Sequence, residues 1–176
     1  AEALQNAFSE WVWSDPERAT RLAAVYNRRF NSVVLRDYAQ VGEALTLPGL
    51  VDKWSRRAHQ RAAVARVLTE PAVGLFHEVG AGKTAEMVMS AMEMRRMGLA
   101  RKPVVVVPNH MLDQFAREWL QLYPQARVLT AGSDDLAGDQ RRVFVARAAT
   151  NEWDAVVMTQ EAFKRIPVST EFQVSY

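Results

Sequence analysis

Short apolar runs and amphipathic stretches alternate along the second half of the chain. Four runs have the continuous apolar or β-branched composition of buried strands: 72–76, 103–107, 126–130 and 155–159. Three stretches between them have helical composition or spacing: 85–97, 109–122 and 140–149. Strands that alternate with helices through short links predict an α/β fold, with a mostly parallel sheet and helices on both of its faces.

At the N-terminus the pattern predicts helix instead of sheet. Residues 1–13 are weakly amphipathic. Ser14 and Asp15 then supply capping candidates, and Pro16 supplies the fixed φ that suits a first helical turn. A helix is therefore expected over about 16–29.

A less regular stretch separates this helix from the α/β part. Residues 31–50 have turn chemistry near Gly42 and little periodicity, which indicates an irregular connector. A helix at about 57–68 follows it. The sequence thus predicts a helical lead-in region at 1–52 and an α/β domain at 53–176.

Composition narrows the class of protein. The 176 residues are 49% hydrophobic and 24% charged, as expected of a soluble globular protein. Among the 22 basic residues, arginine predominates, and its side chain suits bidentate phosphate contacts, so the composition permits a nucleic-acid partner. The absence of cysteine excludes disulfides and thiolate metal sites. The sequence shows no membrane-length apolar run and no signal-peptide pattern, so we expect a cytoplasmic protein without a membrane partner.

The stretch GLFHEVGAGKT, from Gly74 to Thr84, has the composition of a phosphate-binding loop. Gly80 and Gly82 allow the backbone to curl so that several N–H groups converge on phosphate oxygens. Lys83 offers a charge to the β- and γ-phosphates, and the Thr84 hydroxyl can ligate Mg²⁺. An ordinary glycine-rich turn between a strand and a helix is the alternative interpretation.

Two further features lie around this loop. Five basic residues and no acid occur over 53–66, which a solvated helix face would also explain. Gln60 lies in this stretch, and its amide can match the N6 and N7 edge of adenine. The residues that follow three of the expected strands are polar, small or amide-bearing: 108–110, 130–132 and 159–160. Contacts to phosphates require such residues, but polar residues also commonly end strands.

Four segments resemble motifs of superfamily 2 helicases, particularly the Swi/Snf-like branch of double-stranded DNA translocases. They are RAHQ at 57–60, HEVGAGKT at 77–84, VVVVPNHMLDQFAREW at 104–119 and WDAVVMT at 153–159. The lead-in DPERATRLAAVYNRRFN at 15–31 resembles that of large phage- and plasmid-borne helicase proteins, some fused to adenine DNA methyltransferases. The resemblance implies a P-loop NTPase with a RecA-like sheet that binds ATP and Mg²⁺.

The resemblance also implies roles for individual residues. Lys83 is the expected catalytic residue, Thr84 the expected Mg²⁺ ligand, and Gln60 the expected reader of adenine. The rest of the expected phosphate cradle is Glu78, Val79, Gly80, Ala81 and Gly82. The residues expected along one DNA strand, in contact with its phosphates and without sequence readout, are Pro108, Asn109, His110, Gly132, Thr159 and Gln160. His77 replaces an aspartate that is usual in these helicases, and we expect it to be a hydrogen-bonded structural histidine.

One element of the family is missing from the sequence. Superfamily 2 helicases carry an acid pair at the end of a later strand, which holds Mg²⁺ and activates water. Asp134 and Asp135 follow a turn, Asp154 precedes its expected strand, and Glu161 is a poor substitute. We therefore expect an ATP-binding, N-terminal part of a longer helicase or translocase, inactive alone and completed by a second lobe. A non-catalytic nucleotide- or DNA-binding module and a small P-loop kinase are the alternatives.

Overall fold

A computed structural model describes residues 2–32, 36–54 and 57–167. The chain divides into two compact units, Ala1–Asp37 and Tyr38–Tyr176, and each is described by itself. The boundary lies earlier than residue 52, where the sequence placed it.

The first unit is a pair of helices, α1 (Glu2–Trp13) and α2 (Pro16–Phe30). Asp15 caps α2, because its side chain accepts hydrogen bonds from the Glu17 and Arg18 amides. The bond from the Arg18 amide lowers the pKa of Asp15. Neither helix contains a buried residue, and Phe8 and Trp13 are largely exposed. The pair therefore has no core of its own.

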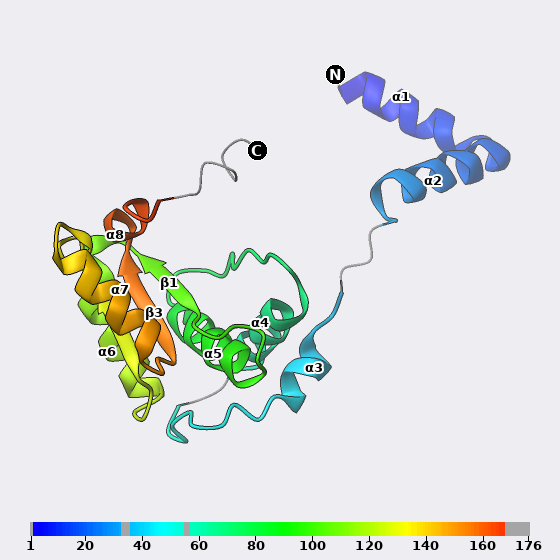
Figure 1. Cartoon of the computed structure of the whole chain (residues 1–176). Helices are drawn as coiled ribbons and strands as arrows, with labels where there is room; N and C mark the ends of the chain where they lie inside the picture. Colours follow the sequence, from blue (N-terminus) through cyan, green and yellow to red (C-terminus); the bar gives the residue numbers. More distant parts are fainter. Residues whose placement is uncertain (1, 33–35, 55–56, 168–176) are drawn as a thin grey trace. The chain divides into compact units, whose positions relative to one another are not determined.

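The second unit contains a parallel sheet of three strands: β1 (Val104–Val107), β2 (Val128–Ala131) and β3 (Ala155–Thr159). β3 lies in the middle, with β1 and β2 on either side of it. Figure 1 shows β1 and β3 side by side. Val107 is in register with Thr159, and Ala131 with Met158, so the carboxyl ends of all three strands reach the same edge. The α/β class and the parallel sheet are confirmed.

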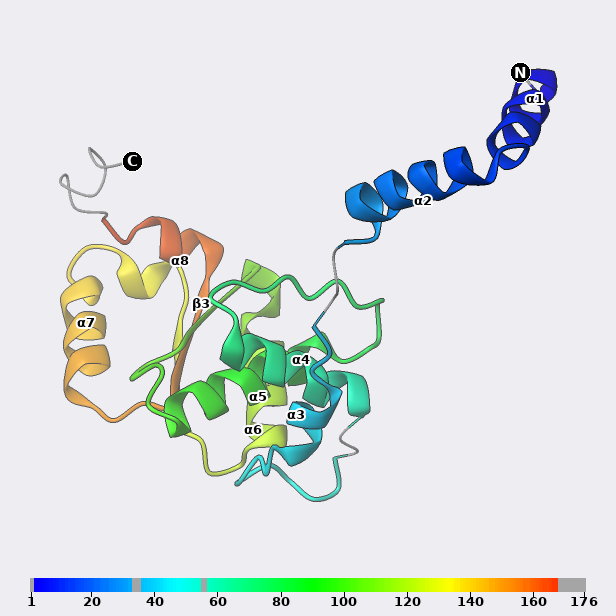
Figure 2. The same cartoon turned by 90° about the vertical axis from the view of Figure 1, so that its right-hand side faces the viewer.

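Helices cover both faces of this sheet. One face packs against α4 (Ala58–Thr69), α5 (Lys83–Arg96) and α6 (Leu112–Leu122), around the buried side chains of Met89, Trp119 and Val157. The other face packs against α7 (Gln140–Thr150) and α8 (Gln160–Lys164), around Phe144 and Met158. Figure 2 shows α7 on one side of β3, and α4, α5 and α6 on the other.

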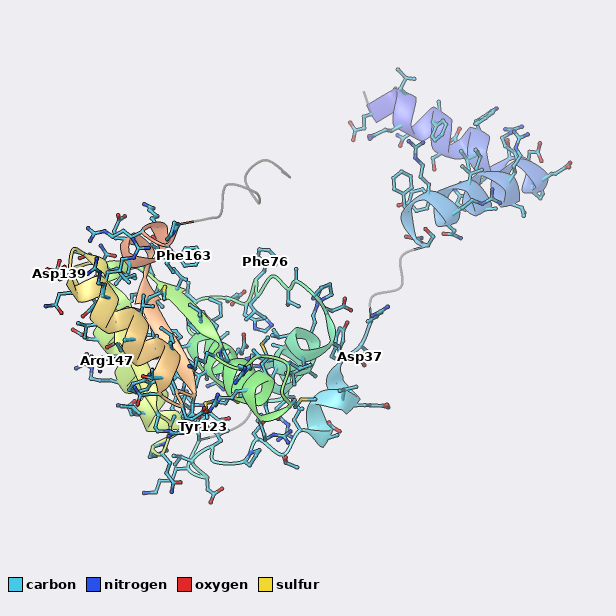
Figure 3. The ribbon with its side chains drawn as sticks, in the orientation of Figure 1. Asp37, Phe76, Tyr123, Asp139, Arg147 and Phe163 are labelled. Carbon is cyan, nitrogen blue, oxygen red and sulfur yellow. The ribbon has the colours of Figure 1, made fainter. Side chains whose placement is uncertain are left out.

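The expected strand at 72–76 is wrong. This segment is irregular, and the side chain of Phe76 is 95% exposed and projects from it (Figure 3). A strand needs a neighbour that completes its backbone hydrogen bonds, and among the described residues β1, β2 and β3 pair only with one another. The apolar composition of 72–76 favours a strand but does not show whether a neighbouring strand is available to pair with it.

The expected irregular connector at 31–50 is also partly wrong, because it contains the helix α3 (Ala39–Ala44). The guanidinium of Arg61 in α4 donates to the Gly42 carbonyl at 2.9 Å, and Leu47 and Leu50 lie in the core. Residues 38–52 therefore pack with the second unit, although the sequence assigned them to the lead-in region.

Short helices account for the other differences. Asn109–Met111 (η1) and Asp134–Leu136 (η2) form single 3₁₀ turns after β1 and β2, and α8 directly follows β3. Among the described residues, none of the helices combines the length and apolar character that crossing a membrane requires.

Candidate nucleotide-binding site

The predicted phosphate-binding loop leads into the N-terminus of α5, which is directed toward the carboxyl ends of the strands. Arg95, in the last turn of α5, donates from Nε to Asp154 at 2.8 Å, and Asp154 immediately precedes β3. The C-terminus of α5 is thereby fixed at the amino edge of the sheet. Since α5 has 14 residues, its N-terminus lies about 20 Å away along the helix axis.

Two glycines give the loop its shape. Gly80 has φ of 85° and Gly82, the N-cap of α5, has φ of 92°, a conformation that L side chains rarely adopt. A Cβ at Gly82 would also lie 2.3 Å from Nε2 of Gln60. The backbone conformation therefore favours glycine at position 82, and a larger residue would also displace the amide of Gln60.

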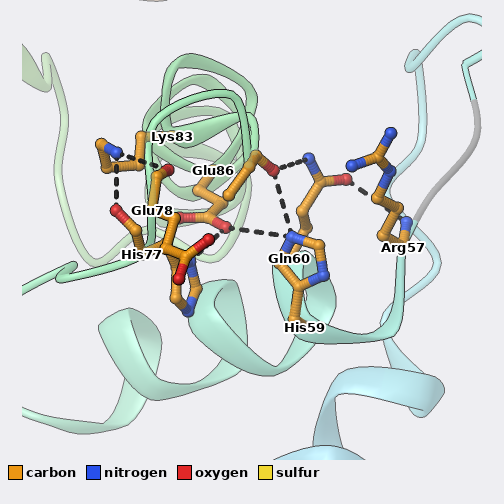
Figure 4. A network of polar contacts seen from close by, with 8 residues as sticks. Arg57, His59, Gln60, His77, Glu78, Lys83 and Glu86 are labelled. Atoms are coloured by element: carbon orange, nitrogen blue, oxygen red, sulfur yellow. Dashed lines mark hydrogen bonds and ion pairs between the residues drawn. The ribbon is translucent and has the colours of Figure 1, made fainter.

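Lys83 is the first residue of α5, and its ammonium group folds back over the loop. Its Nζ donates to the carbonyls of His77 and Glu78 at 2.7 and 2.9 Å (Figure 4). Among the described residues it forms no salt bridge. A cation at a helix N-terminus also meets the positive end of the helix dipole. The ammonium group of Lys83 therefore adds to the positive end of the α5 dipole, and no salt bridge among the described residues neutralises it.

Gln60 connects α4 to the loop. Its Oε1 accepts a hydrogen bond from the Arg57 amide at 3.3 Å, and its Nε2 donates to the Ala81 carbonyl at 3.1 Å (Figure 4). The side chain is buried. To read adenine, the amide would have to exchange these partners, so the adenine role of Gln60 stays a prediction.

Behind the loop lies a cluster formed by His59, His77 and Glu86. His77 Nδ1 donates to Glu86 Oε1 at 2.7 Å, as expected of a hydrogen-bonded histidine at this position. His59 Nε2 lies 3.9 Å from the same oxygen and 3.1 Å from the Ala81 carbonyl. Glu86 is fully buried.

Sequence reasoning missed Glu86 and His59. One signal for Glu86 was available, because it lies three residues before Met89 and seven before Glu93, on a face of α5 that is buried throughout. An acid on such a face requires a partner.

The residues expected to contact DNA gather at the carboxyl edge but differ in availability. Asn109, His110 and Gln160 are exposed. Thr159 is buried, and its hydroxyl accepts a hydrogen bond from the Ala162 amide as the cap of α8. The Gly132 amide, which a phosphate would need, donates to Asp135 at 2.8 Å. Pro108, which precedes Asn109 in the chain, is half-buried.

The acidic residues considered from sequence are engaged elsewhere. Asp135 accepts from the Gly132 amide, Asp154 holds Arg95 at the amino edge, and Glu161 pairs with Lys164 at 2.9 Å. None of these carboxylates contacts the loop. These three residues therefore supply no acidic partner to the loop.

Two family descriptions match the chain. Residues 1–32, which include α1 and α2, match a domain of unknown function (DUF8437). Residues 69–175, more than half of the chain, match a family described as "Probable helicase domain". No curated protein matches the sequence. The second match begins at the end of α4 and includes the loop, α5 and the whole sheet, so the chain belongs to the probable helicase domain family.

Proposed function

We propose that this chain is the ATP-binding part of a nucleic-acid-dependent ATPase, a DNA helicase or double-stranded DNA translocase of the Swi/Snf-like branch of superfamily 2. The observation that carries the proposal is Lys83, an ammonium group at the N-terminus of α5, beside two glycines of positive φ, whose hydrogen bonds within the described part of the chain go to neutral carbonyls. An anion that enters this loop gains both the lysine charge and the helix dipole.

A triphosphate fits the donors that the loop provides. The backbone over 78–82 would surround the β-phosphate, and Lys83 would move from the His77 and Glu78 carbonyls to the phosphate oxygens. Thr84 would bring its hydroxyl to the Mg²⁺ that accompanies ATP. Gln60 lies next to the loop and would turn its amide to adenine once Ala81 moves.

The same edge of the sheet supports a DNA contact. Asn109, His110 and Gln160 are exposed there, after the ends of β1 and β3. Contacts from such side chains and from nearby backbone amides reach phosphates and sugars, and they carry no sequence information. We therefore propose double-stranded DNA, bound without sequence preference, as the partner, together with a further helicase lobe of a phage- or plasmid-borne protein.

A second candidate is a nucleotide- or DNA-binding module without turnover. The engaged carboxylates of Asp135, Asp154 and Glu161 favour it, because Mg²⁺ held only by Thr84 and the phosphates lacks its second side. The two candidates share the ATP site, so binding tests both and hydrolysis by a longer protein separates them.

Calorimetric titration of the chain with Mg-ATP tests the site. We expect Lys83→Ala to weaken binding about 10- to 100-fold, the loss of one hydrogen-bonded contact to a charged group. Lys53→Ala is the matched control, because Lys53 is exposed and lies outside the loop, and it should bind like the wild type. Equal affinity of the wild type and Lys83→Ala, with circular dichroism unchanged, would overturn the assignment.

A further inference from the structure

We propose that His59, His77 and Glu86 form a binding site for a divalent transition-metal ion of the Zn²⁺ class. This site is distinct from the Mg²⁺ that a nucleotide would bring. One ligand atom from each of the three residues lies within 4.8 Å of the others, and this is the single such group found in the described part of the chain.

The ligand types select the kind of metal. Two imidazole nitrogens and one carboxylate oxygen suit Zn²⁺ and its neighbours, whereas Mg²⁺ prefers oxygen ligands throughout. Three protein ligands complete most of a tetrahedral shell and leave one position open. His59 is 41% exposed, so this fourth position can be reached from solvent.

The buried carboxylate supplies an independent reason for an ion. Glu86 is fully buried, and only its Oε1 has a hydrogen-bond partner, from His77. Its Oε2 has none among the described residues. A buried carboxylate oxygen without a donor is unfavourable, and a metal ion held by this carboxylate would stabilise it.

His59 can reach the metal without leaving another group unpaired. Ligand atoms bonded tetrahedrally to Zn²⁺ at about 2.0–2.2 Å lie about 3.4 Å from one another. His59 Nε2, at 3.9 Å, must therefore move toward Glu86 Oε1, whereas His77 Nδ1, at 2.7 Å, must give up its proton and move away from that oxygen. His59 Nε2 now contacts the Ala81 carbonyl, but Gln60 Nε2 donates to that same carbonyl at 3.1 Å. When His59 turns to the metal, Ala81 keeps one donor.

The three ligands come from three separate segments. His59 lies in α4, His77 in the loop and Glu86 in α5, as the close-up in Figure 4 shows. A bound ion would therefore fasten the loop to both helices that flank it, and it should raise the temperature of unfolding. Metal binding is independent of the proposed ATPase function. An effect of the bound metal on ATP affinity would rest on that function.

Titration of the full chain with ZnCl₂, in the absence of nucleotide, tests the site. We expect one ion per chain by calorimetry, and d–d absorption bands of low-symmetry coordination when Co²⁺ replaces Zn²⁺. His59→Asn, His77→Asn and Glu86→Gln should each weaken binding at least about tenfold. His110→Asn is the matched control, because His110 is the third and last histidine of the chain and lies outside the cluster, and it should leave the affinity unchanged.

A second measurement needs no substitution. Diethyl pyrocarbonate modifies free imidazoles, so Zn²⁺ should protect His59 and His77 from modification and leave His110 reactive, as read by mass spectrometry. Absence of saturable binding, equal protection of all three histidines, or unchanged affinity in folded cluster variants would overturn the proposal. Because no ATP is present, each of these results leaves the ATP assignment to its own test.

Discussion

The two edges of the sheet both carry basic side chains, but they use them in opposite ways. At the amino edge, Arg95 is paired with Asp154 and Glu152, and Lys102 donates to the Ala148 and Ala149 carbonyls in the last turn of α7. A lysine at a helix C-terminus meets the negative end of the dipole and satisfies carbonyls that the helix leaves unpaired. Arg95 is thus paired with carboxylates, and Lys102 lies at the negative end of the α7 dipole.

At the carboxyl edge, Lys83 also donates to carbonyls, but it does so at the N-terminus of α5. There the dipole and the ammonium group have the same sign, so the arrangement becomes favourable when an anion joins it. The comparison teaches that the position of a lysine on a helix, more than the number of its hydrogen bonds, separates a ligand-binding cation from a structural one.

The largest expected effect concerns hydrolysis. Since Asp135, Asp154 and Glu161 are engaged away from the loop, we expect steady-state phosphate release from Mg-ATP and duplex DNA at background rate, with or without Lys83. An arginine finger alone contributes about 10³- to 10⁵-fold in related phosphoryl transfers, and the acid pair contributes further. DNA-stimulated turnover on the order of 1 s⁻¹ that disappears in Lys83→Ala would contradict this expectation and would direct attention to Glu161.

A smaller effect separates the two ends of α5. Gly82 and Gly98 both have positive φ, of 92° and 74°, so alanine at either position should cost about 1–2 kcal/mol of backbone strain. A Cβ at Gly82 also meets Gln60, whereas a Cβ at Gly98 meets nothing within 4 Å.

Gly82→Ala should therefore lose ATP affinity as well as stability, while Gly98→Ala should lose stability alone. Chemical denaturation and ATP titration of the two variants measure this difference. An equal loss of ATP affinity in both would mean that the shape of the loop does not determine binding.

The smallest expected change in ATP affinity is at the amino edge of the sheet. Arg95→Met keeps the aliphatic packing but removes the bonds to Asp154, and it should destabilise the fold by about 1–3 kcal/mol. The exposed Arg142→Met serves as the control on α7. The ATP affinity of the folded fraction should stay unchanged in both variants. Weaker ATP binding by folded Arg95→Met would mean that the amino edge also contributes to ATP binding, which contradicts the comparison.

Sequence reasoning succeeded where local composition determines structure. The bounds of β3 agree with the predicted strand at 155–159, and Asp15 caps α2 as its side-chain chemistry predicts. The predicted helix at 85–97 begins earlier, at Lys83, because the left-handed Gly82 directly precedes it.

It failed where structure depends on residues far apart in the chain. The run at 72–76 has the composition of a strand, but no described strand pairs with it. The short α3 has no periodicity to detect, and its packing depends on Arg61, 19 residues from Gly42. The partners of Glu86 could not be predicted, because only the fold brings His77 and His59 beside it.

The measurement that tests the comparison most directly is a titration of the ¹⁵N-labelled chain with Mg-ATP, followed by amide chemical shifts. We expect saturable shifts at 77–86 and at Gln60, and unchanged amides at 95–102 and at 152–154, where Arg95 and Lys102 already have partners. Lys83→Ala should weaken the shifts in the loop. Saturable shifts centred on the amino edge, or no saturable shift at all, would contradict the assignment of the carboxyl edge as the ligand-binding side of this protein.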